Sequence, residues 1–165
     1  MTTRGVVYVH ATPSALCPHV EWAISSVLGG RVSLEWTPQP AAPGTLRAEL
    51  SWQGEPGSAA SIASALRDWH LLRFEVTEEP TASSEGARYS CTPELGLFAA
   101  TTGLHGDLMV REDRIRAALA RAASDPSTSV QKELADLLGT RWDEELEPFR
   151  YAGEGAPVRW LHQVV

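Results

Sequence analysis

The sequence predicts a single α+β domain built on an antiparallel sheet, and three observations lead to this expectation. Over residues 1–80, segments with strand-like and helix-like hydrophobic periods follow in the order strand, helix, strand, strand, helix, strand. The chain has 165 residues, of which 43% are hydrophobic and 21% are charged, a composition typical of one globular domain. No internal repeat, heptad run or long linker divides it, so we expect one domain over residues 1–165.

The first half opens with a buried strand over residues 4–11, where β-branched and aromatic residues show little polar alternation. A helix over residues 14–28 follows, and glycines at 29 and 30 end it. Its apolar residues fall on one face, namely Leu16, Val20, Ala23, Ile24 and Val27.

Two alternating segments, residues 31–37 and 45–54, then predict strands with one buried and one polar face. A second helix over residues 57–69 precedes another alternating strand over residues 71–79. The order of elements is that of the ferredoxin-like βαββαβ sheet, in which two helices cover one face of an antiparallel sheet.

The second half, residues 86–165, is expected to extend that sheet with a hairpin formed by residues 88–93 and 96–103. An additional helical segment follows: a helix over 112–124 with Leu119 facing inward, a helix that ends at Gly139, and a short helical turn that stops at Pro148. Thr128 and Gln131 have the spacing of a capping box for the second of these helices. The apolar residues 157–165 predict a C-terminal strand.

Charge and hydropathy exclude two broad classes of partner. The formal net charge is -7 and the pI is near 5.2, which argues against a general nucleic-acid binder because such proteins need a basic surface. No apolar run reaches the length of a signal-peptide core or a membrane span. We therefore expect a cytoplasmic protein without membrane insertion. Its cysteines, Cys17 and Cys91, are expected to be free thiols, with a disulfide as the alternative.

Cys17 and His19, in the stretch "CPHVEW", are the first candidates for catalysis. The helix dipole lowers the thiol pKa of a cysteine at the start of a helix. Residues two apart on a helix do not face each other, however, so a base for Cys17 would have to be another residue, such as His10. A packed cysteine is the simpler interpretation.

His105 and Asp107, in "TTGLHGDLMV", are the second catalytic candidates. If their side chains meet, they form an acid–base couple. If the Asp107 side chain instead hydrogen-bonds its own backbone, the two residues only stabilise a turn. We favour the turn. The histidines, cysteines and acids of the chain match no zinc or calcium motif, so we expect neither a metal site nor a cofactor.

Four residues are candidates for binding a partner. Trp22 lies off the apolar stripe of its helix, and aromatic residues in such positions are favoured at interfaces. Arg111, which directly precedes the predicted helix 112–124, and Arg114 and Arg121 within it form the best docking patch for an anionic partner. Arginines paired with nearby acids are the alternative interpretation.

Several long strings, among them "RGVVYVHATPSALCPHVEWA", "HGDLMVREDRIRAALARA" and "GEGAPVRWLHQVV", resemble an actinobacterial family catalogued as a domain of unknown function. The resemblance spans the whole chain and brings no activity, cofactor or catalytic residue. It implies single-domain cytoplasmic proteins whose genes neighbour those of type II fatty-acid synthesis. It therefore suggests an acidic carrier protein as partner.

The leading hypothesis from the sequence is a binding or interaction module, because recognised catalytic motifs are absent. The partner is an acidic carrier protein or, for a homodimer, a second copy of the chain. The first alternative is a small enzyme that uses Cys17 or the His105–Asp107 turn. The second alternative is a sensor that holds an acyl or other small ligand between the sheet and its helices. A sheet of this kind supports all three.

Overall fold

A computed structural model describes residues 1–151, in which strands interspersed with helices are followed by a run of strands and then by three helices. The strands are β1 (Thr3–Pro13), β2 (Thr37–Pro38), β3 (Thr45–Gly54), β4 (Arg73–Glu78), β5 (Gly86–Thr92), β6 (Gly96–Thr102) and β7 (Leu108–Met109). The helices are the 3-10 turn η1 (Ser14–Leu16) and the α-helices α1 (Cys17–Leu28), α2 (Ser58–Leu66), α3 (Glu112–Ser124), α4 (Val130–Leu138) and α5 (Thr140–Arg150).

The seven strands of residues 1–151 join one sheet in the order β2-β3-β1-β4-β5-β6-β7, and each strand is antiparallel to its neighbours. The predicted α+β class is therefore confirmed. β1 lies at the centre of the first half, where Val7 pairs with Leu50 of β3 on one side and Val76 of β4 on the other. This split arrangement agrees with the predicted element order, while the ferredoxin-like assignment itself stays a prediction.

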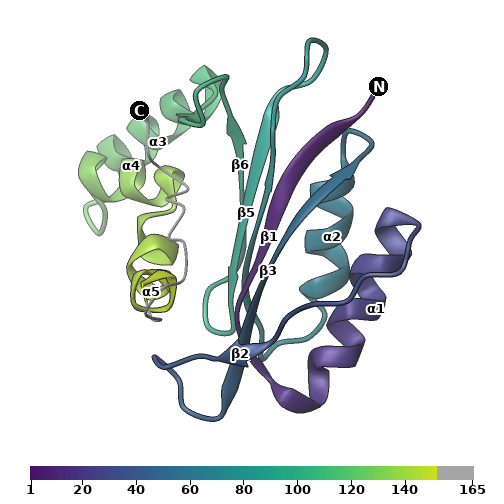
Figure 1. Cartoon of the computed structure of the whole chain (residues 1–165). Coiled ribbons are helices and arrows are strands. Elements are labelled where there is room, and N and C mark those ends of the chain that lie inside the picture. Colours follow the sequence, from purple (N-terminus) through teal and green to yellow (C-terminus); the bar gives the residue numbers. More distant parts are fainter. Residues whose placement is uncertain (152–165) are drawn as a thin grey trace.

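The hydrophobic core lies between one face of the sheet and the helices α1 and α2, which Figure 1 shows side by side on that face. Helix α2 buries small and branched residues there, as its sequence pattern predicts. The buried core consists of Val7, Val9, Val20, Ala23, Ile24, Leu34, Trp52, Ala59, Ile62, Ala63, Leu66, Leu72, Phe74, Val76 and Cys91. Helices α3, α4 and α5 lie on the other side of the sheet (Figure 1).

The strand predicted over residues 31–37 is wrong except at Thr37, which begins the two-residue β2. Polar side chains of α1 bind this segment instead. Val32 N donates to Ser25 Oγ at 2.8 Å, and Glu21 Oε1 accepts from Leu34 N at 2.9 Å. Since α1 satisfies these backbone groups, the segment has no need of a neighbouring strand.

The hairpin β5–β6 and the limits of α3 are confirmed, but details of the last helices differ from the prediction. Ser129, not Thr128, caps α4 by accepting from Lys132 N at 3.1 Å. The expected inward position of Leu119 is not observed: it is 47% exposed on α3, which packs mainly against α4. Helix α5 runs through Pro148 to Arg150, although a proline lacks the N–H that continues a helix.

The predictions of a C-terminal strand and of a single domain are not tested by the structure. The C-terminal strand over residues 157–165 lies outside the described residues. The single domain over residues 1–165 also stays a prediction. Within residues 1–151, no helix combines the length and the apolar character needed to cross a bilayer.

Candidate functional site

The second face of the sheet carries polar side chains that helix α5 covers. Because side chains alternate along a strand, residues next to the core valines of β1 and β4 point to this face. His10 of β1, Glu75 of β4 and Arg88 of β5 are all buried there. They come from positions far apart in the sequence, and the sheet brings them together beneath α5.

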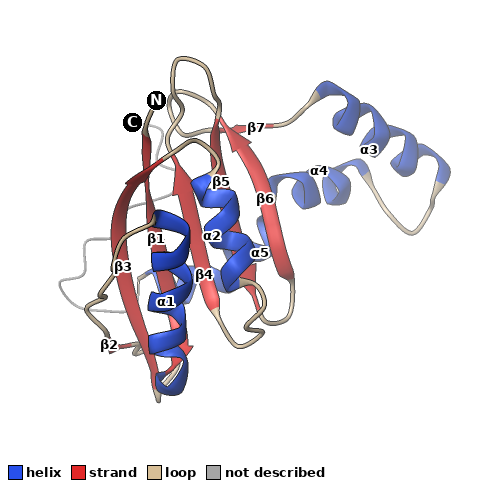
Figure 2. Cartoon of the chain, turned by 90° about the vertical axis from the view of Figure 1, so that its right-hand side faces the viewer, coloured by secondary structure: helices blue, strands red, loops and turns tan. Residues whose placement is uncertain are grey.

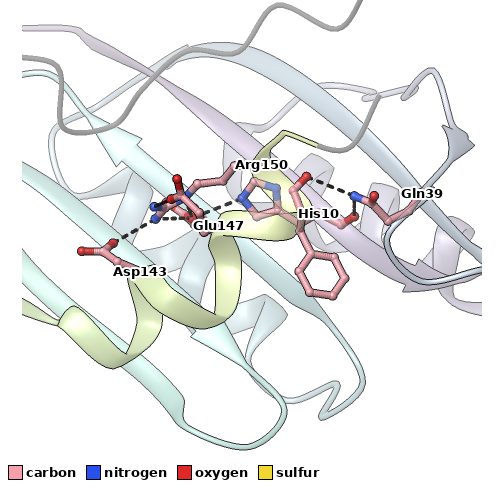
Figure 3. A network of polar contacts seen from close by, with 7 residues as sticks. His10, Gln39, Asp143, Glu147 and Arg150 are labelled. Atoms are coloured by element: carbon pink, nitrogen blue, oxygen red, sulfur yellow. Dashed lines mark hydrogen bonds and ion pairs between the residues drawn. The ribbon is translucent and has the colours of Figure 1, made fainter. Parts of the chain in front are cut away.

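An ion-pair network around Arg150 connects α5 to the sheet (Figure 3). The Glu75 side chain has 0% exposure, and its Oε1 lies 2.7 Å from both Nε and Nη2 of Arg150. The same Nη2 lies 3.1 Å from Asp143 Oδ1, and Arg150 Nη1 lies 3.8 Å from Glu147 Oε2. One arginine at the end of α5 thus contacts three carboxylates, one of them fully buried.

The two buried arginines of this face respond differently to their surroundings. Burial lowers the pKa of Arg150, but the charges and hydrogen bonds of Glu75 and Asp143 outweigh it and hold the pKa above its ordinary value. For Arg88 burial prevails, and its pKa falls below the ordinary value despite attraction from the same two acids. Arg150 is therefore the better compensated cation of the pair.

His10 is the third titratable group beside Glu75. Its Nε2 lies 3.3 Å from Glu75 Oε1, and its ring stacks on Tyr8 with centroids 5.9 Å apart. Neither His10 Nε2 nor Glu75 Oε2 has a hydrogen-bond partner among the described residues. An imidazole and a carboxylate at this distance are capable of acid–base chemistry.

Two further contacts fasten the end of α5 to the first half of the chain. The buried Gln39 Nε2 donates to His10 O at 2.7 Å and to Phe149 O at 3.3 Å. The Arg73 guanidinium lies 4.7 Å from the centroid of the Phe149 ring, a cation–π distance. These contacts explain why α5 continues past Pro148.

Cys17 and His19 do not form a pair. Cys17 is the first residue of α1 and is buried, with its Sγ 4.0 Å from Pro13 O. Burial first, and then the charge of Glu21, raise the pKa of the Cys17 thiol. His19 is exposed on α1, and its ring lies 6.1 Å from that of Trp69.

Iodoacetamide is expected to alkylate Cys17 at least about tenfold more slowly in the folded chain than in the urea-unfolded chain at neutral pH. A raised pKa leaves less thiolate at any pH below it, and burial restricts access. The rate should also keep rising with pH beyond the point at which a free thiol levels off. Peptide mass spectrometry of quenched samples measures the rate, and equal rates in both states would contradict this prediction.

His105 and Asp107 lie on a tight turn between β6 and β7. Gly103 N donates to Asp107 O at 2.9 Å, and Gly106, with φ +82°, donates its N–H to Gly103 O at 3.0 Å. Both side chains are exposed. The backbone hydrogen bonds agree with turn chemistry at this position.

The candidate binding residues lie at separate places on the surface. Trp22 is 69% exposed on the outer side of α1. Arg114 is exposed on α3 and makes no ion pair within residues 1–151. Arg111 pairs with Asp113 at 3.3 Å, and Arg121 pairs with Glu133 of α4 at 3.0 Å. The pair formed by Arg121 thus links the two helices.

The α3–α4 hairpin extends beyond the edge of the sheet next to β7 (Figure 2). Helix α3 packs mainly on α4, and its Ala118 is buried there. On α4, three apolar residues repeat at every fourth position and are exposed, which places them on one face. We call this face the α4 stripe; it consists of Val130, Leu134 and Leu138.

No group of three or more histidine, cysteine, aspartate or glutamate residues within residues 1–151 is arranged to hold a metal ion. In a comparison with known families, the model described as Protein of unknown function (DUF3145) matches residues 6–163. Neither a curated protein nor a solved structure matches the chain.

Proposed function

This chain belongs to the family described as Protein of unknown function (DUF3145), and we propose that it is a binding module that presents its α3–α4 hairpin to an acidic protein partner. The observation that carries the proposal is the α4 stripe. Its three apolar side chains are exposed on a helix pair that projects from the sheet (Figure 2). Exposed apolar patches with a polar rim are typical of protein-binding surfaces.

The charges of α3 support an acidic partner. The exposed arginines on and beside α3 are Arg111, Arg114, Arg116 and Arg121, whereas Glu112 and Asp113 are its acids. The helix is therefore locally basic in a chain whose net charge is -7. Arginine is also enriched at interfaces, because its flat guanidinium bonds carboxylates and packs on apolar groups.

An acyl carrier protein is the acidic partner that we propose, on the strength of the family resemblance. Such a partner would place apolar side chains on the α4 stripe and carboxylates toward Arg114. The buried network beneath α5 would then be structural support, since it fastens the end of α5, the helix that directly follows α4, to the sheet. A homodimer would use the same stripe for a second copy of the chain.

We expect Leu134→Ser and Arg114→Glu each to weaken binding to a purified acyl carrier protein by about tenfold, as measured by isothermal titration calorimetry. The serine removes apolar contact area, and the glutamate repels an acidic surface. Arg31→Glu is the matched control, because Arg31 is exposed in the segment that follows α1, away from the hairpin. All three variants should keep the unfolding midpoint of the parent chain.

Two outcomes would contradict this proposal. Equal affinities for the Leu134→Ser variant and the parent chain would exclude the hairpin as the interface. In sedimentation velocity of the chain alone, a dimer that Leu134→Ser dissociates would mean that a second copy covers the stripe. The carrier protein would then have to bind elsewhere.

A further inference from the structure

Strand β6 has an open edge over its first half. Within residues 1–151 its outer neighbour is β7, which pairs only with the last two residues of β6 (Figure 2). Gly103 N, on the β7 side, donates to Asp107 O. Because the backbone groups of successive residues point to opposite sides of a strand, those of Ala99 and Leu97 point the same way as Gly103 N. Their N–H and C=O groups therefore face no other strand of the described part of the chain.

This edge lacks the features that keep sheet edges from pairing with other chains. Proteins protect open edges with charged residues, prolines or bulges. At the opposite side of the sheet, β2 contains Pro38, and the alternate residues Arg47 and Glu49 of β3 are charged. Strand β6 carries neither a charged residue nor a proline, its pairing with β5 has no bulge, and Ala99 at its middle is exposed. Of the two edges, β6 is therefore the one suited to accept another strand.

A groove of about 180 Å³ lies beside this edge. Its walls include Ala99 and Thr101 of β6, Met109 of β7, and Arg111 and Arg114 at the start of α3. After Met109 the chain leaves the sheet, so a strand in line with β7 would continue opposite Ala99. The groove is smaller than the pockets of about 300–1,000 Å³ that small molecules occupy. Its position along an open strand edge favours an extended peptide instead.

The charges beside the groove favour an acidic peptide. Both acids in the first turn of α3 are paired, Glu112 with Arg116 at 2.6 Å and Asp113 with Arg111 at 3.3 Å. Arg114 makes no ion pair within residues 1–151 and forms part of the groove wall. An arginine binds a carboxylate through two parallel N–H groups. A carboxylate at this end of the groove would therefore find an exposed guanidinium.

We propose that β6 accepts an extended acidic segment of a partner protein as an additional strand, in line with β7 and with a carboxylate against Arg114. Main-chain hydrogen bonds to Leu97 and Ala99 provide the affinity, and Arg114 provides the preference for acids. The interaction goes beyond the docking of a carrier protein. Arg114 belongs to both surfaces, but no residue of the α4 stripe lines the groove.

Amide hydrogen exchange measured by NMR tests this proposal with a capped peptide of alternating valine and threonine that has a glutamate at each end. In the chain alone, the Leu97 and Ala99 amides should exchange rapidly, whereas the Phe98 amide, which faces β5, is protected. Saturating peptide should slow the exchange of Leu97 and Ala99 at least about tenfold. The same peptide with all backbone nitrogens methylated should have no effect. Lysine in place of glutamate should weaken binding about tenfold.

Ala99→Pro is the variant that blocks the edge. The Ala99 N–H points away from β5, so a proline there removes no hydrogen bond of the β5–β6 ladder, and such positions tolerate proline. The variant should keep the unfolding midpoint of the parent chain and lose peptide binding. Ala100→Pro is its control, because the Ala100 N–H faces β5 and its loss should destabilise the fold.

Three outcomes would overturn the proposal. The first is peptide affinity that Ala99→Pro leaves unchanged. The second is equal binding of the methylated, lysine and glutamate peptides, a comparison that uses the parent chain and does not depend on the folding of Ala99→Pro. The third is protection of Leu97 and Ala99 that rises with concentration in the chain alone, because a second copy would then cover the edge.

Discussion

Arg150→Met is expected to lower the free energy of unfolding by about 3–5 kcal/mol, because it leaves a fully buried carboxylate without its cationic partner. Glu75 has no exposure, and its Oε1 takes both short contacts from Arg150. Methionine keeps much of the apolar volume of the arginine stem but offers no donor. The nearby His10 lies 3.3 Å from the same oxygen and does not replace two guanidinium contacts at 2.7 Å.

Urea denaturation followed by tryptophan fluorescence measures this loss, and Arg116→Met is its matched control. Arg116 makes an equally short contact, 2.6 Å to Glu112, but both side chains are exposed on α3. An exposed pair of this spacing contributes only about 0.3–0.5 kcal/mol. Similar losses for Arg150→Met and Arg116→Met would show that burial adds nothing to the contact with Glu75.

A double variant distinguishes the cost of a stranded charge from the net value of the pair. Replacing both members of a buried ion pair by apolar residues is often close to neutral. Glu75→Leu combined with Arg150→Met should therefore be more stable than Arg150→Met alone. A double variant that is less stable than Arg150→Met would show that the unpaired Glu75 carboxylate does not destabilise the fold. The loss in Arg150→Met would then not come from a buried unpaired charge.

The network illustrates why the first half of the fold could be predicted from sequence while its second face could not. Alternation along residues 71–79 correctly separates Phe74 and Val76 from Glu75. It shows that the two faces differ, but it does not reveal what covers the polar one. Glu75 has the pattern of a solvated residue, yet it is fully buried and pairs with Arg150 of α5.

The errors near α1 and α5 have a similar cause. Residues 31–37 alternate like a strand, yet side chains of α1 take their backbone hydrogen bonds. Pro148 is a local signal for the end of a helix, but contacts of Phe149 and Arg150 with the sheet extend α5 beyond it. In each case, a contact between distant parts of the sequence outweighs a local preference.

Gly139 shows the opposite case, a local signal that was confirmed. The sequence predicts that a helix ends there, and Gly139 is the C-cap of α4 and the N-cap of α5 with φ 71° and ψ 28°. A Cβ at this position would lie 2.5 Å from Cε1 of Phe98 on β6. The Phe98 ring is buried and contacts Trp142 with centroids 5.2 Å apart, so its freedom to move aside is limited.

Gly139→Ala is therefore expected to cost about 2–4 kcal/mol. The left-handed backbone accounts for about 1–2 kcal/mol of this loss, and overpacking against Phe98 adds about 1–2 kcal/mol. Gly29→Ala is a close control, because Gly29 caps α1 with φ 74° and ψ 12° and a Cβ there meets nothing within 4 Å. The difference between the two variants in urea denaturation isolates the Phe98 contact. Because this contact packs the α4–α5 junction on the sheet, a loss at Gly139 no larger than at Gly29 would mean that Phe98 does not hold the hairpin in place.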